Sequence, residues 1–336
     1  MAAGLPAPGA PPSSSRPQAT RLTIAASGDF LIHTPLAAQA LANGGGTRYD
    51  FAPMFRPVRR WIRGADLALC HVETPLVPGP PAGYPSFRTP PGLVRAIRVT
   101  GWDACSTASN HSLDAGQGGV NSTIRALRRA HIPFDGTAAS PRGRRRFPIL
   151  EAGGAQVAFL AYTAVSNGQL VPNPWSLNWA SPRRILADAR AARRRGADAV
   201  IVNLHWGAEF QHAPSSQQLA LARRLTRSPD VTAIVGQHAH VVQPIRRVNG
   251  KIVVFGEGNL VSNQSDACCP TGSQDGLIAF LRLVVDRRRA RVVRARYLPV
   301  WVRHPDFTVL PAPPDSFART VSVVGRRAYL RPLRPR

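Results

Sequence analysis

Short apolar runs and amphipathic segments alternate along most of the chain, from residue 22 to about residue 260. Each apolar run has the length of a buried strand, and each amphipathic segment repeats apolar residues three and four apart, as on one helix face. The predicted strands cover residues 22–26, 66–72, 104–108, 157–162, 199–204, 231–235 and 252–255. The predicted helices cover residues 53–63, 93–99, 112–130, 181–195 and 214–227. This alternation predicts the α/β fold class.

Later parts of the chain have a different pattern. Residues 276–286 and 291–300 have the pattern of two adjacent strands that close the sheet as antiparallel additions. Residues 147–162 are predicted to form a hairpin around Gly153 and Gly154. From residue 311 on, a Pro-rich turn, a short helix and a basic tail are expected.

The N-terminal segment is rich in Ala, Pro, Gly and Ser, and it has no apolar core of the kind that a signal peptide needs. No stretch of the chain approaches the roughly 20 apolar residues that span a bilayer. We expect residues 1–20 to be a disordered lead-in, or the remnant of a longer N-terminus. We predict one domain over residues 21–303 and a basic C-terminal extension over residues 304–336.

Chemically active side chains stand where the predicted strands end. Asp29 comes after the first strand and a Gly, Glu73 after the second strand, and Asn110 after the third. In α/β sheets the carboxyl ends of the strands form the edge where binding sites are built. The candidate metal ligands are Asp29, Glu73, Asn110, His205, His238 and His240.

Carboxylate, amide and imidazole groups together make a mixed oxygen and nitrogen ligand set. Such a set suits Mn, Fe or Zn better than Ca or Mg, which prefer oxygen ligands alone. We predict one or two divalent ions, which would supply a hydroxide near neutral pH. His111, which is not assigned as a ligand, is predicted to protonate the leaving group. Asp114 is interpreted as a turn or cap residue rather than a ligand.

His238 and His240 are two residues apart, with Ala239 between them. If this segment is extended, alternate side chains lie on the same side, so both imidazoles face one way. A pair of histidines held in this manner at a strand end suits a divalent metal. Two polar residues in a surface loop are the alternative interpretation.

Three further residues are predicted to contact the substrate. Arg88 lies in a Pro- and Gly-rich loop over residues 77–91, which is long enough to form a flap or rim. Glu209 ends the segment that begins with His205, and Asn259 ends a Gly-Glu-Gly-Asn loop. The first of these loops could bring Arg88 to a ligand, and the last could present backbone amides or Asn259 to one.

The chain has a formal net charge of +25, and Lys251 is its only lysine. The arginines are scattered over predicted helix faces and turns. A field of this sign attracts polyanions in general, so we expect an anionic polymer or a phosphorylated substrate as the partner. The chain has no helix-turn-helix, RRM or finger pattern, and we therefore expect no specific nucleic-acid binding.

Four cysteines are too few for a disulfide framework in a chain of 336 residues. Cys70 and Cys105 fall near the ends of predicted strands and are interpreted as small buried hydrophobes. Cys268 and Cys269 are adjacent in a polar loop and have no Cys-x-x-Cys partner, so zinc binding by their thiolates is only weakly indicated. These residues leave the redox compartment open.

Six motifs in a fixed order give the chain its resemblance to a known family. They are Gly28-Asp29, Val72-Glu73-Thr74-Pro75, Asn110-His111 with Leu113-Asp114 and Gly116, His205-Trp206-Gly207 with Glu209, Gly236-x-His238-x-His240-Val241, and Gly256-x-Gly258-Asn259. From about Thr23 to Tyr297 the chain resembles the CapA family of capsule-synthesis, poly-γ-glutamate-associated proteins. That family is similar in pattern to the calcineurin-like metallophosphoesterases. The resemblance implies a four-layer α/β/β/α sandwich with the site at the sheet edge.

The resemblance also implies a role for each metal ligand. Asp29 and His240 would hold the first ion, and Glu73 would bridge the two ions. The second ion would be held by Asn110, His205 and His238.

One position departs from the metallophosphoesterase pattern. These enzymes usually carry a His two residues after the first Asp, and here that residue is Leu31, while His33 lies two residues further on. The first site is therefore expected to be the weaker one, and a single ion is an alternative to two. His71 stands where family members more often have Asn, and we interpret it as a supporting partner of Glu73 or as a buried structural histidine.

Two functions agree with this resemblance. The first is a metal-dependent hydrolase that acts on a phosphoester or on an amide-linked acidic polymer of the bacterial envelope. The alternative is a non-catalytic protein that binds or assembles an anionic polymer such as polyglutamate. The resemblance also implies a place in the cell envelope or outside the cytoplasm, with membrane proteins of capsule synthesis as partners, although no anchor is visible.

Overall fold

Two β-sheets face each other in the computed structural model, which describes residues 19–286 and 289–334. The first sheet has the strand order β14-β13-β12-β1-β2-β3-β4, with β11 beside β1 and β15 beside β13. Its strands are β1 (Thr20–Phe30), β2 (Leu67–Val72), β3 (Ala104–Ser106), β4 (Phe134–Asp135), β11 (Asn259–Val261), β12 (Asp275–Asp286), β13 (Arg289–Arg303), β14 (Thr308–Pro311) and β15 (Leu330–Pro332). The predicted lead-in lies, up to residue 18, outside the described residues.

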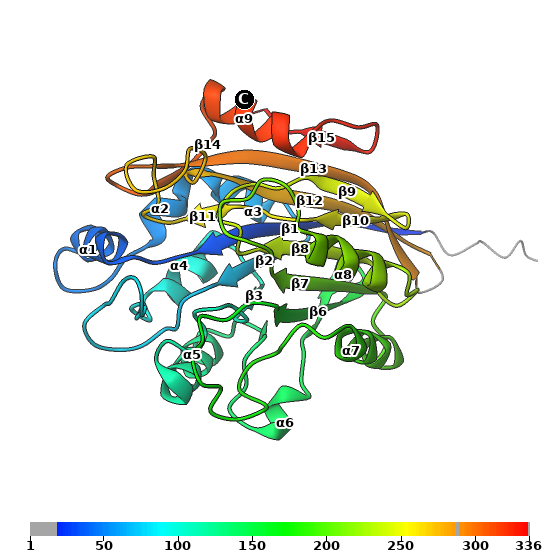
Figure 1. Cartoon of the computed structure of the whole chain (residues 1–336), viewed down its shortest axis with the longest axis horizontal. Coiled ribbons are helices and arrows are strands. Elements are labelled where there is room, and N and C mark those ends of the chain that lie inside the picture. Colours follow the sequence, from blue (N-terminus) through cyan, green and yellow to red (C-terminus); the bar gives the residue numbers. More distant parts are fainter. Residues whose placement is uncertain (1–18, 287–288, 335–336) are drawn as a thin grey trace, which may run out of the picture.

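The second sheet has the strand order β5-β6-β7-β8-β10-β9. Its strands are β5 (Ile149–Ala152), β6 (Ala155–Thr163), β7 (Ala199–His205), β8 (Ala233–Gln237), β9 (Ile245–Val248) and β10 (Lys251–Val254). β1 to β4 run parallel in the first sheet, as β6, β7 and β8 do in the second. The arrowheads of β1, β6 and β7 point to the same side in Figure 1, so the carboxyl ends of both sheets meet there.

Helices cover the outer face of each sheet. They are α1 (Thr34–Asn43), α2 (Ala52–Phe55), η1 (Arg56–Val58), α3 (Arg59–Arg63), α4 (Leu93–Thr100), α5 (Gly116–Arg129), α6 (Pro141–Arg144), α7 (Pro182–Arg194), α8 (Ser216–Thr226) and α9 (Pro314–Val324). Between the sheets, Ile24 of β1 shares one apolar cluster with Phe159 of β6 and Ile201 of β7. Residues of α1, α2 and α4 pack on the first sheet, and residues of α7 and α8 pack on the second. This arrangement confirms the predicted α/β sandwich of four layers.

None of the helices in the described ranges has both the length and the apolar character needed to cross a membrane.

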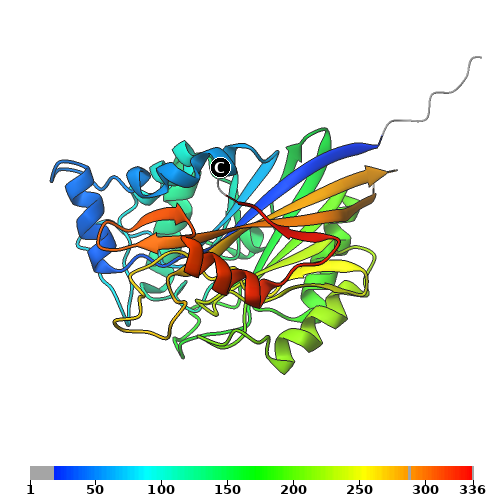
Figure 2. The ribbon, with the colours of Figure 1, turned by 90° about the horizontal axis from the view of Figure 1, so that it is seen from above.

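The late strands are antiparallel, as the sequence predicts. β12 pairs antiparallel with β1 and with β13, and β5 forms a hairpin with β6. The predicted C-terminal extension, in contrast, is part of the sheet, since β14 and β15 both pair with β13. Figure 2 shows α9 lying across the same strands. The strand pattern was not recognised there because both strands are short and end in Pro.

A disulfide joins Cys70 of β2 to Cys105 of β3, which corrects the interpretation of these residues as small buried hydrophobes. The parallel register sets the two residues opposite each other, with their Cα atoms 4.4 Å apart. Sequence alone does not reveal this pairing, because it depends on which strands become neighbours. Cys268 and Cys269 are free.

Candidate metal centre

Acidic and imidazole side chains meet at the carboxyl ends of β1 and β2. Asp29 of β1 lies beside His71 of β2 in the parallel register, and Glu73 follows β2 directly. All three side chains are fully buried. β1 reaches this point because Gly28 passes very close to the loop at Gly258: a Cβ on Gly28 would lie 1.9 Å from the Gly258 oxygen. Glycine is therefore required just before Asp29.

Imidazoles surround the Asp29 carboxylate on several sides. Its Oδ1 lies 3.6 Å from Nε2 of His71 and 3.7 Å from Nδ1 of His205. Its Oδ2 lies 3.4 Å from Nδ1 of His240 and accepts a hydrogen bond of 3.2 Å from the backbone N–H of His238. The two contacts of Oδ1 are longer than hydrogen bonds, which leaves space for an ion between the groups.

The Glu73 carboxylate lies between two of these imidazoles. Its Oε1 is 3.8 Å from Nε2 of His205 and 3.7 Å from Nε2 of His240. The Oδ1 atom of Asn110 is 2.8 Å from Nε2 of His205. The rings of His205 and His238 lie with their centroids 4.7 Å apart. The residues that the sequence predicted as ligands are thus brought together at one place.

Several buried polar atoms of this cluster have no hydrogen-bond partner among the described residues. They are Oδ1 of Asp29, both carboxylate oxygens of Glu73, both ring nitrogens of His71, Nδ1 of His205 and Nδ1 of His238. Since buried polar groups are almost always paired, converging unpaired oxygens and nitrogens fit a divalent cation. The groups with ligand atoms close enough to share an ion, in the described part of the chain, are Asp29 with His71 and His205, Asp29 with Glu73 and His240, and Glu209 with His238 and His240.

His238 and His240 converge for a different reason from the one that the sequence suggested. β8 ends at Gln237, and both histidines have positive φ, 92° for His238 and 55° for His240. The segment is therefore not extended, and the prediction of alternating side chains was wrong. Such a backbone costs roughly 1–3 kcal/mol for each non-glycine residue, a strain that is typical of binding and catalytic loops.

The two carboxylates are perturbed in opposite directions. Burial acts to raise the pKa of Asp29, but the hydrogen bond and charge of His240 outweigh it and hold the pKa below its usual value. Burial, and then the charge of Asp29, raise the pKa of Glu73 well above its usual value. A bound divalent cation would stabilise both ionised carboxylates in this buried place.

Most of the imidazoles are kept neutral. Burial lowers the pKa of His71 to about 4 and that of His238 to about 3, and it lowers the pKa of His205 well below the usual value. His240 differs, because Glu73 and Asp29 outweigh its burial and raise its pKa to about 10. The neutral imidazole is the form that binds metal, so His240 would release a proton when an ion binds.

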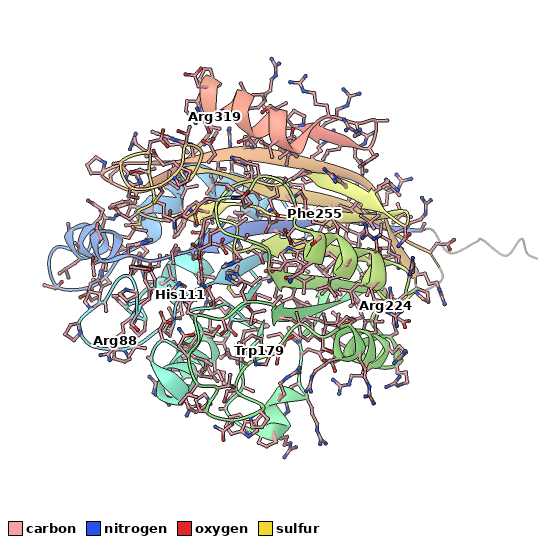
Figure 3. All side chains as sticks on the ribbon, viewed as in Figure 1. Arg88, His111, Trp179, Arg224, Phe255 and Arg319 are labelled. Atoms are coloured by element: carbon pink, nitrogen blue, oxygen red, sulfur yellow. A yellow bond between two sulfur atoms is a disulfide. The ribbon has the colours of Figure 1, made fainter. Side chains whose placement is uncertain are left out.

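His111 lies beside the cluster and pairs with Asp114. Its Nδ1 is 2.8 Å from Oδ2 of Asp114, and its ring meets Phe87 edge-on with centroids 4.6 Å apart. Asp114 also accepts a hydrogen bond from the backbone N–H of Phe87, so it does more than the turn or cap role that the sequence suggested. The sequence could have indicated this pairing, because Asp114 follows His111 by three residues. Figure 3 places His111 and Arg88 on the side of the molecule toward which β1 points.

The loop between β6 and α7 supplies residues that the sequence analysis missed. Asn110 donates its amide N–H to Oδ1 of Asn167 over 3.0 Å, which leaves the Asn110 oxygen turned toward His205. Gln169 donates to Oδ1 of Asp114 over 2.7 Å. Neither loop residue follows a strand directly, so no pattern pointed to it.

The residues predicted to contact the substrate have different positions. Arg88 is exposed, and so is Glu209, which is close enough to His238 and His240 to share an ion with them. Asn259 is fully buried, and its Oδ1 lies 3.0 Å from Nδ1 of His240. Its position is that of a residue that orients His240, and its contact with substrate stays a prediction.

Leu31 and His33 take no part in the cluster. Leu31 is buried, and Nδ1 of His33 lies 3.1 Å from the Leu31 carbonyl oxygen. Within the described ranges, His33 belongs to no group of residues that could hold a metal. His71 instead lies in the Asp29 group, where it could bind an ion directly.

Solved structures share this fold. A calcineurin-like phosphoesterase from Bacillus subtilis matches with a TM-score of 0.55 and 15% sequence identity, over 90% of this chain and 96% of that chain. A 5′-nucleotidase precursor from Thermus thermophilus matches with a TM-score of 0.51 and 16% identity, over 88% of this chain and 55% of that chain. The chain therefore has the calcineurin-like phosphoesterase fold, and the cluster at its sheet edge has the ligands for a divalent metal.

Sequence comparison gives the family within that class. A sequence model of the bacterial capsule synthesis protein family PGA_cap matches residues 23–264, and the chain belongs to this family. The capsule biosynthesis protein CapA of Bacillus anthracis is 26% identical over 255 residues, which are 73% of this chain and 60% of that protein. A probable polyglutamine synthesis accessory protein of Mycobacterium tuberculosis (strain CDC 1551 / Oshkosh) is 27% identical over 233 residues, 64% of this chain and 60% of that protein. The resemblance to CapA is confirmed, and the chain spans about 60% of the length of these relatives.

Proposed function

We propose that the protein is a divalent-metal-dependent hydrolase that acts on a phosphoester or on an amide bond of an acidic envelope polymer. The convergence of unpaired, buried carboxylate and imidazole atoms at the sheet edge carries this proposal. The names of relatives, which refer to capsule biosynthesis, support an envelope polymer, and the net charge of +25 supports an acidic one. The mixed ligand set favours Mn, Fe or Zn.

The chemistry of the site follows from its parts. A bound divalent ion would lower the pKa of a water molecule toward neutrality and stabilise the oxygens of a phosphoryl or acyl centre. His111 stands beside the ligands, and Asp114 orients its imidazole through a contact of 2.8 Å with Nδ1. His111 therefore suits the role of a group that donates a proton to the leaving group. Phe87 packs on this imidazole and shields it from water.

The proposal includes His71 as a ligand. Leu31 stands where a His is usual and offers no lone pair to an ion. Both ring nitrogens of His71 are buried without a hydrogen-bond partner in the described part of the chain, and Nε2 faces Oδ1 of Asp29 at 3.6 Å. His71 would thus supply the imidazole that Leu31 cannot.

The alternative function is the non-catalytic binding or assembly of an anionic polymer. It is favoured by the net charge of the chain and by the loss of a usual ligand at Leu31. That its partners are membrane proteins of capsule synthesis stays a prediction.

The decisive experiment measures metal content and hydrolysis in the same preparation. The wild type is expected to bind a divalent ion and to hydrolyse a phosphodiester or poly-γ-glutamate when Mn is added, and Asp29→Ala and His238→Ala to lose both properties. A wild type that neither binds nor is activated by Mn, Fe or Zn would refute the proposal. Salt-sensitive polymer binding that is unchanged in His205→Ala, without hydrolysis, would favour the alternative.

A further inference from the structure

Arginines are five of the twelve described residues that line a cavity far from the metal centre, and Arg60 of α3 is one of them. The cavity has a volume of about 440 Å³ and lies against the first sheet at the end where β1 begins. Arg21 of β1, Arg282 of β12, and Arg294 and Arg296 of β13 line it, and we call these residues the arginine shelf. All four are exposed.

Strand register holds the shelf arginines side by side. Arg282 is opposite Arg294 in the antiparallel ladder of β12 and β13, and Phe280 is opposite Arg296 two positions further along. Residues opposite each other in such a ladder have Cβ atoms about 4.5–5.5 Å apart, and like charges directly opposite each other destabilise the pair. The fold thus holds positive charges together at a cost.

No ion pair or side-chain hydrogen bond joins a shelf arginine to another of the described residues. Asp66 is the one carboxylate among the described residues that line the cavity, and its Oδ2 already accepts a hydrogen bond of 2.7 Å from the backbone N–H of Thr23. Trp61 and Phe280 add apolar surface. A bound anion would therefore remove the repulsion and satisfy the guanidinium donors.

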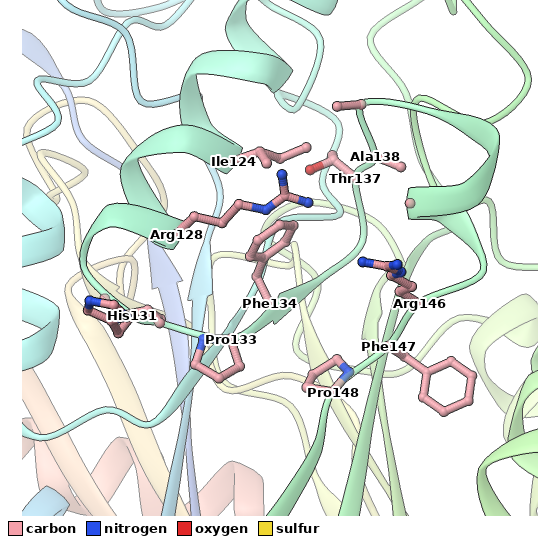
Figure 4. Close-up of a pocket in the computed structure, with 13 residues that line it drawn as sticks. Ile124, Arg128, His131, Pro133, Phe134, Thr137, Ala138, Arg146, Phe147 and Pro148 are labelled. Carbon is pink, nitrogen blue, oxygen red and sulfur yellow. The ribbon is translucent and has the colours of Figure 1, made fainter. Parts of the chain in front are cut away.

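A second cavity is also lined by arginines, but these are not held opposite each other by paired strands. It has a volume of about 430 Å³ and lies between α5 and α6, where Arg128 and Arg146 reach toward it from opposite sides of Phe134 (Figure 4). Arg128 belongs to α5 and Arg146 to the segment after α6. The strand ladder fixes the spacing of Arg282 and Arg294 along the backbone, whereas no such ladder links Arg128 to Arg146.

We propose that the arginine shelf binds a segment of an acidic polymer and so anchors the polymer outside the metal centre. The inference rests on the proposed function, because the acidic polymer is the substrate proposed for the metal centre. Carboxylates repeated along a flexible chain can meet several guanidinium groups in a concave site. A rigid nucleic-acid duplex presents its phosphates on a convex surface, which fits a cavity poorly. β1 rises roughly 20 Å between Thr23 and Asp29, so the anchor would hold the polymer at about that distance from the ligands.

Two double variants with the same change in net charge test the proposal on the full chain. Arg282→Gln with Arg294→Gln removes two charges from the shelf, and Arg128→Gln with Arg146→Gln removes two from the cavity in Figure 4. Fluorescence anisotropy measures the binding of labelled poly-γ-glutamate at about 0.1 M salt. We expect the shelf variant to bind at least tenfold more weakly and the matched control less than twofold more weakly. Metal content and phosphodiester hydrolysis should be unchanged in both.

The melting temperature tests the repulsion between the shelf arginines without any ligand. At low salt the shelf variant should melt at a higher temperature than the wild type, because a like-charged pair is gone. A lower melting temperature with an intact fold would contradict the repulsion from which the shelf is inferred.

Three outcomes decide between polymer binding at the shelf, a general effect of charge, and nucleic-acid binding. Equal weakening in both double variants would assign polymer binding to net charge and overturn the proposal. Tighter binding of DNA through the same arginines would assign the shelf to nucleic acid and also overturn it. Polymer binding that depends on the shelf in a protein without metal-dependent hydrolysis would support the shelf while refuting the hydrolase.

Discussion

Two buried aspartates of the first sheet have very different surroundings. Asp29 lies near the end of β1 and Asp135 at the end of β4, with 0% and 6% of their surfaces exposed. The Asp135 carboxylate is fully hydrogen-bonded: Oδ2 accepts from the backbone N–H of Ala161 over 2.8 Å, and Oδ1 from the side-chain amide of Asn178 over 3.1 Å. Oδ1 of Asp29 has no hydrogen-bond partner in the described part of the chain.

The difference separates a structural polar group from one placed for a ligand. Asp135 ties β4 of the first sheet to β6 of the second, so its hydrogen bonds are part of the fold. Asp29 faces imidazoles at distances that a shared ion would shorten. Burial is common to both residues, and the unpaired atoms are what mark the functional site.

Asp29→Asn should have the largest effect, on metal affinity. The amide keeps the shape of the side chain but offers one neutral oxygen, and Asp29 belongs to two of the groups that could hold an ion. We expect the affinity for Mn or Zn, measured by isothermal titration calorimetry, to fall at least a thousandfold, which is on the order of 4 kcal/mol.

Asp135→Asn is the matched control, since it makes the same change at another buried aspartate of the same sheet. Its metal affinity should stay within about twofold of the wild type, because its partners are Ala161 and Asn178 and not the ligand cluster. A similar loss in both variants would erase the distinction between the two aspartates.

Asp135→Asn should instead change how stability depends on pH. Burial raises the pKa of Asp135 to about 6, although the hydrogen bond from Ala161 opposes the shift. The stabilisation from this raised pKa is fully present below about pH 4 and is lost as the pH rises through about 6. Between these limits the difference in unfolding free energy between wild type and variant should change by about 3 kcal/mol. Asn178 also donates to the Ala161 carbonyl oxygen over 3.1 Å, so turning its amide toward the variant side chain would lose that hydrogen bond; this loss does not depend on pH and leaves the expected change intact.

Urea unfolding of the metal-free protein at pH 4 and pH 7 measures this change. A difference between wild type and variant that is the same at both values would show that the Asp135 carboxyl titrates as it does in the unfolded chain.

Much of the ligand set was predictable from the sequence, because its members stand where apolar runs end. The order of the motifs also identifies the family. Asp29 is the second-last residue of β1, Glu73 follows β2, and His205 ends β7. The fold class was predictable for the same reason, as the apolar period alternates between strand and helix.

Other features depend on tertiary neighbours that no local pattern contains. The contact of Asn167 with Asn110 requires the loop after β6 to meet the end of β3, and the disulfide of Cys70 and Cys105 requires β2 to lie beside β3. The positive φ of His238 occurs in the loop after β8, where the apolar pattern of the strand has already ended. These features emerge only when the sheets are assembled.

His71→Asn should have an intermediate effect, and it tests whether this histidine binds the ion. Asn is shorter and offers a neutral oxygen in place of the unpaired Nε2 that faces Asp29. We expect the affinity of the weaker ion to fall roughly tenfold to thirtyfold, about 1.4–2 kcal/mol. His33→Asn is the matched control, because His33 faces the Leu31 carbonyl group. The metal affinity of this variant should be the same as that of the wild type. If His33→Asn weakens the ion more than His71→Asn, the assignment of His71 fails.

Asn167→Ala should have the smallest effect, since Asn167 acts on the ligands only through Asn110. The hydrogen bond from Asn110 to Oδ1 of Asn167 keeps the other end of the Asn110 amide, its oxygen, directed at His205. Without this acceptor the amide can rotate, and we expect metal affinity to fall about threefold to tenfold, near 1 kcal/mol, which is the worth of one hydrogen bond. Asn167→Asp keeps an acceptor oxygen for the Asn110 amide and should restore the affinity. An Asp variant as weak as the Ala variant would mean that something other than this acceptor orients Asn110, and the β6–α7 loop would then have no part in arranging the ligands.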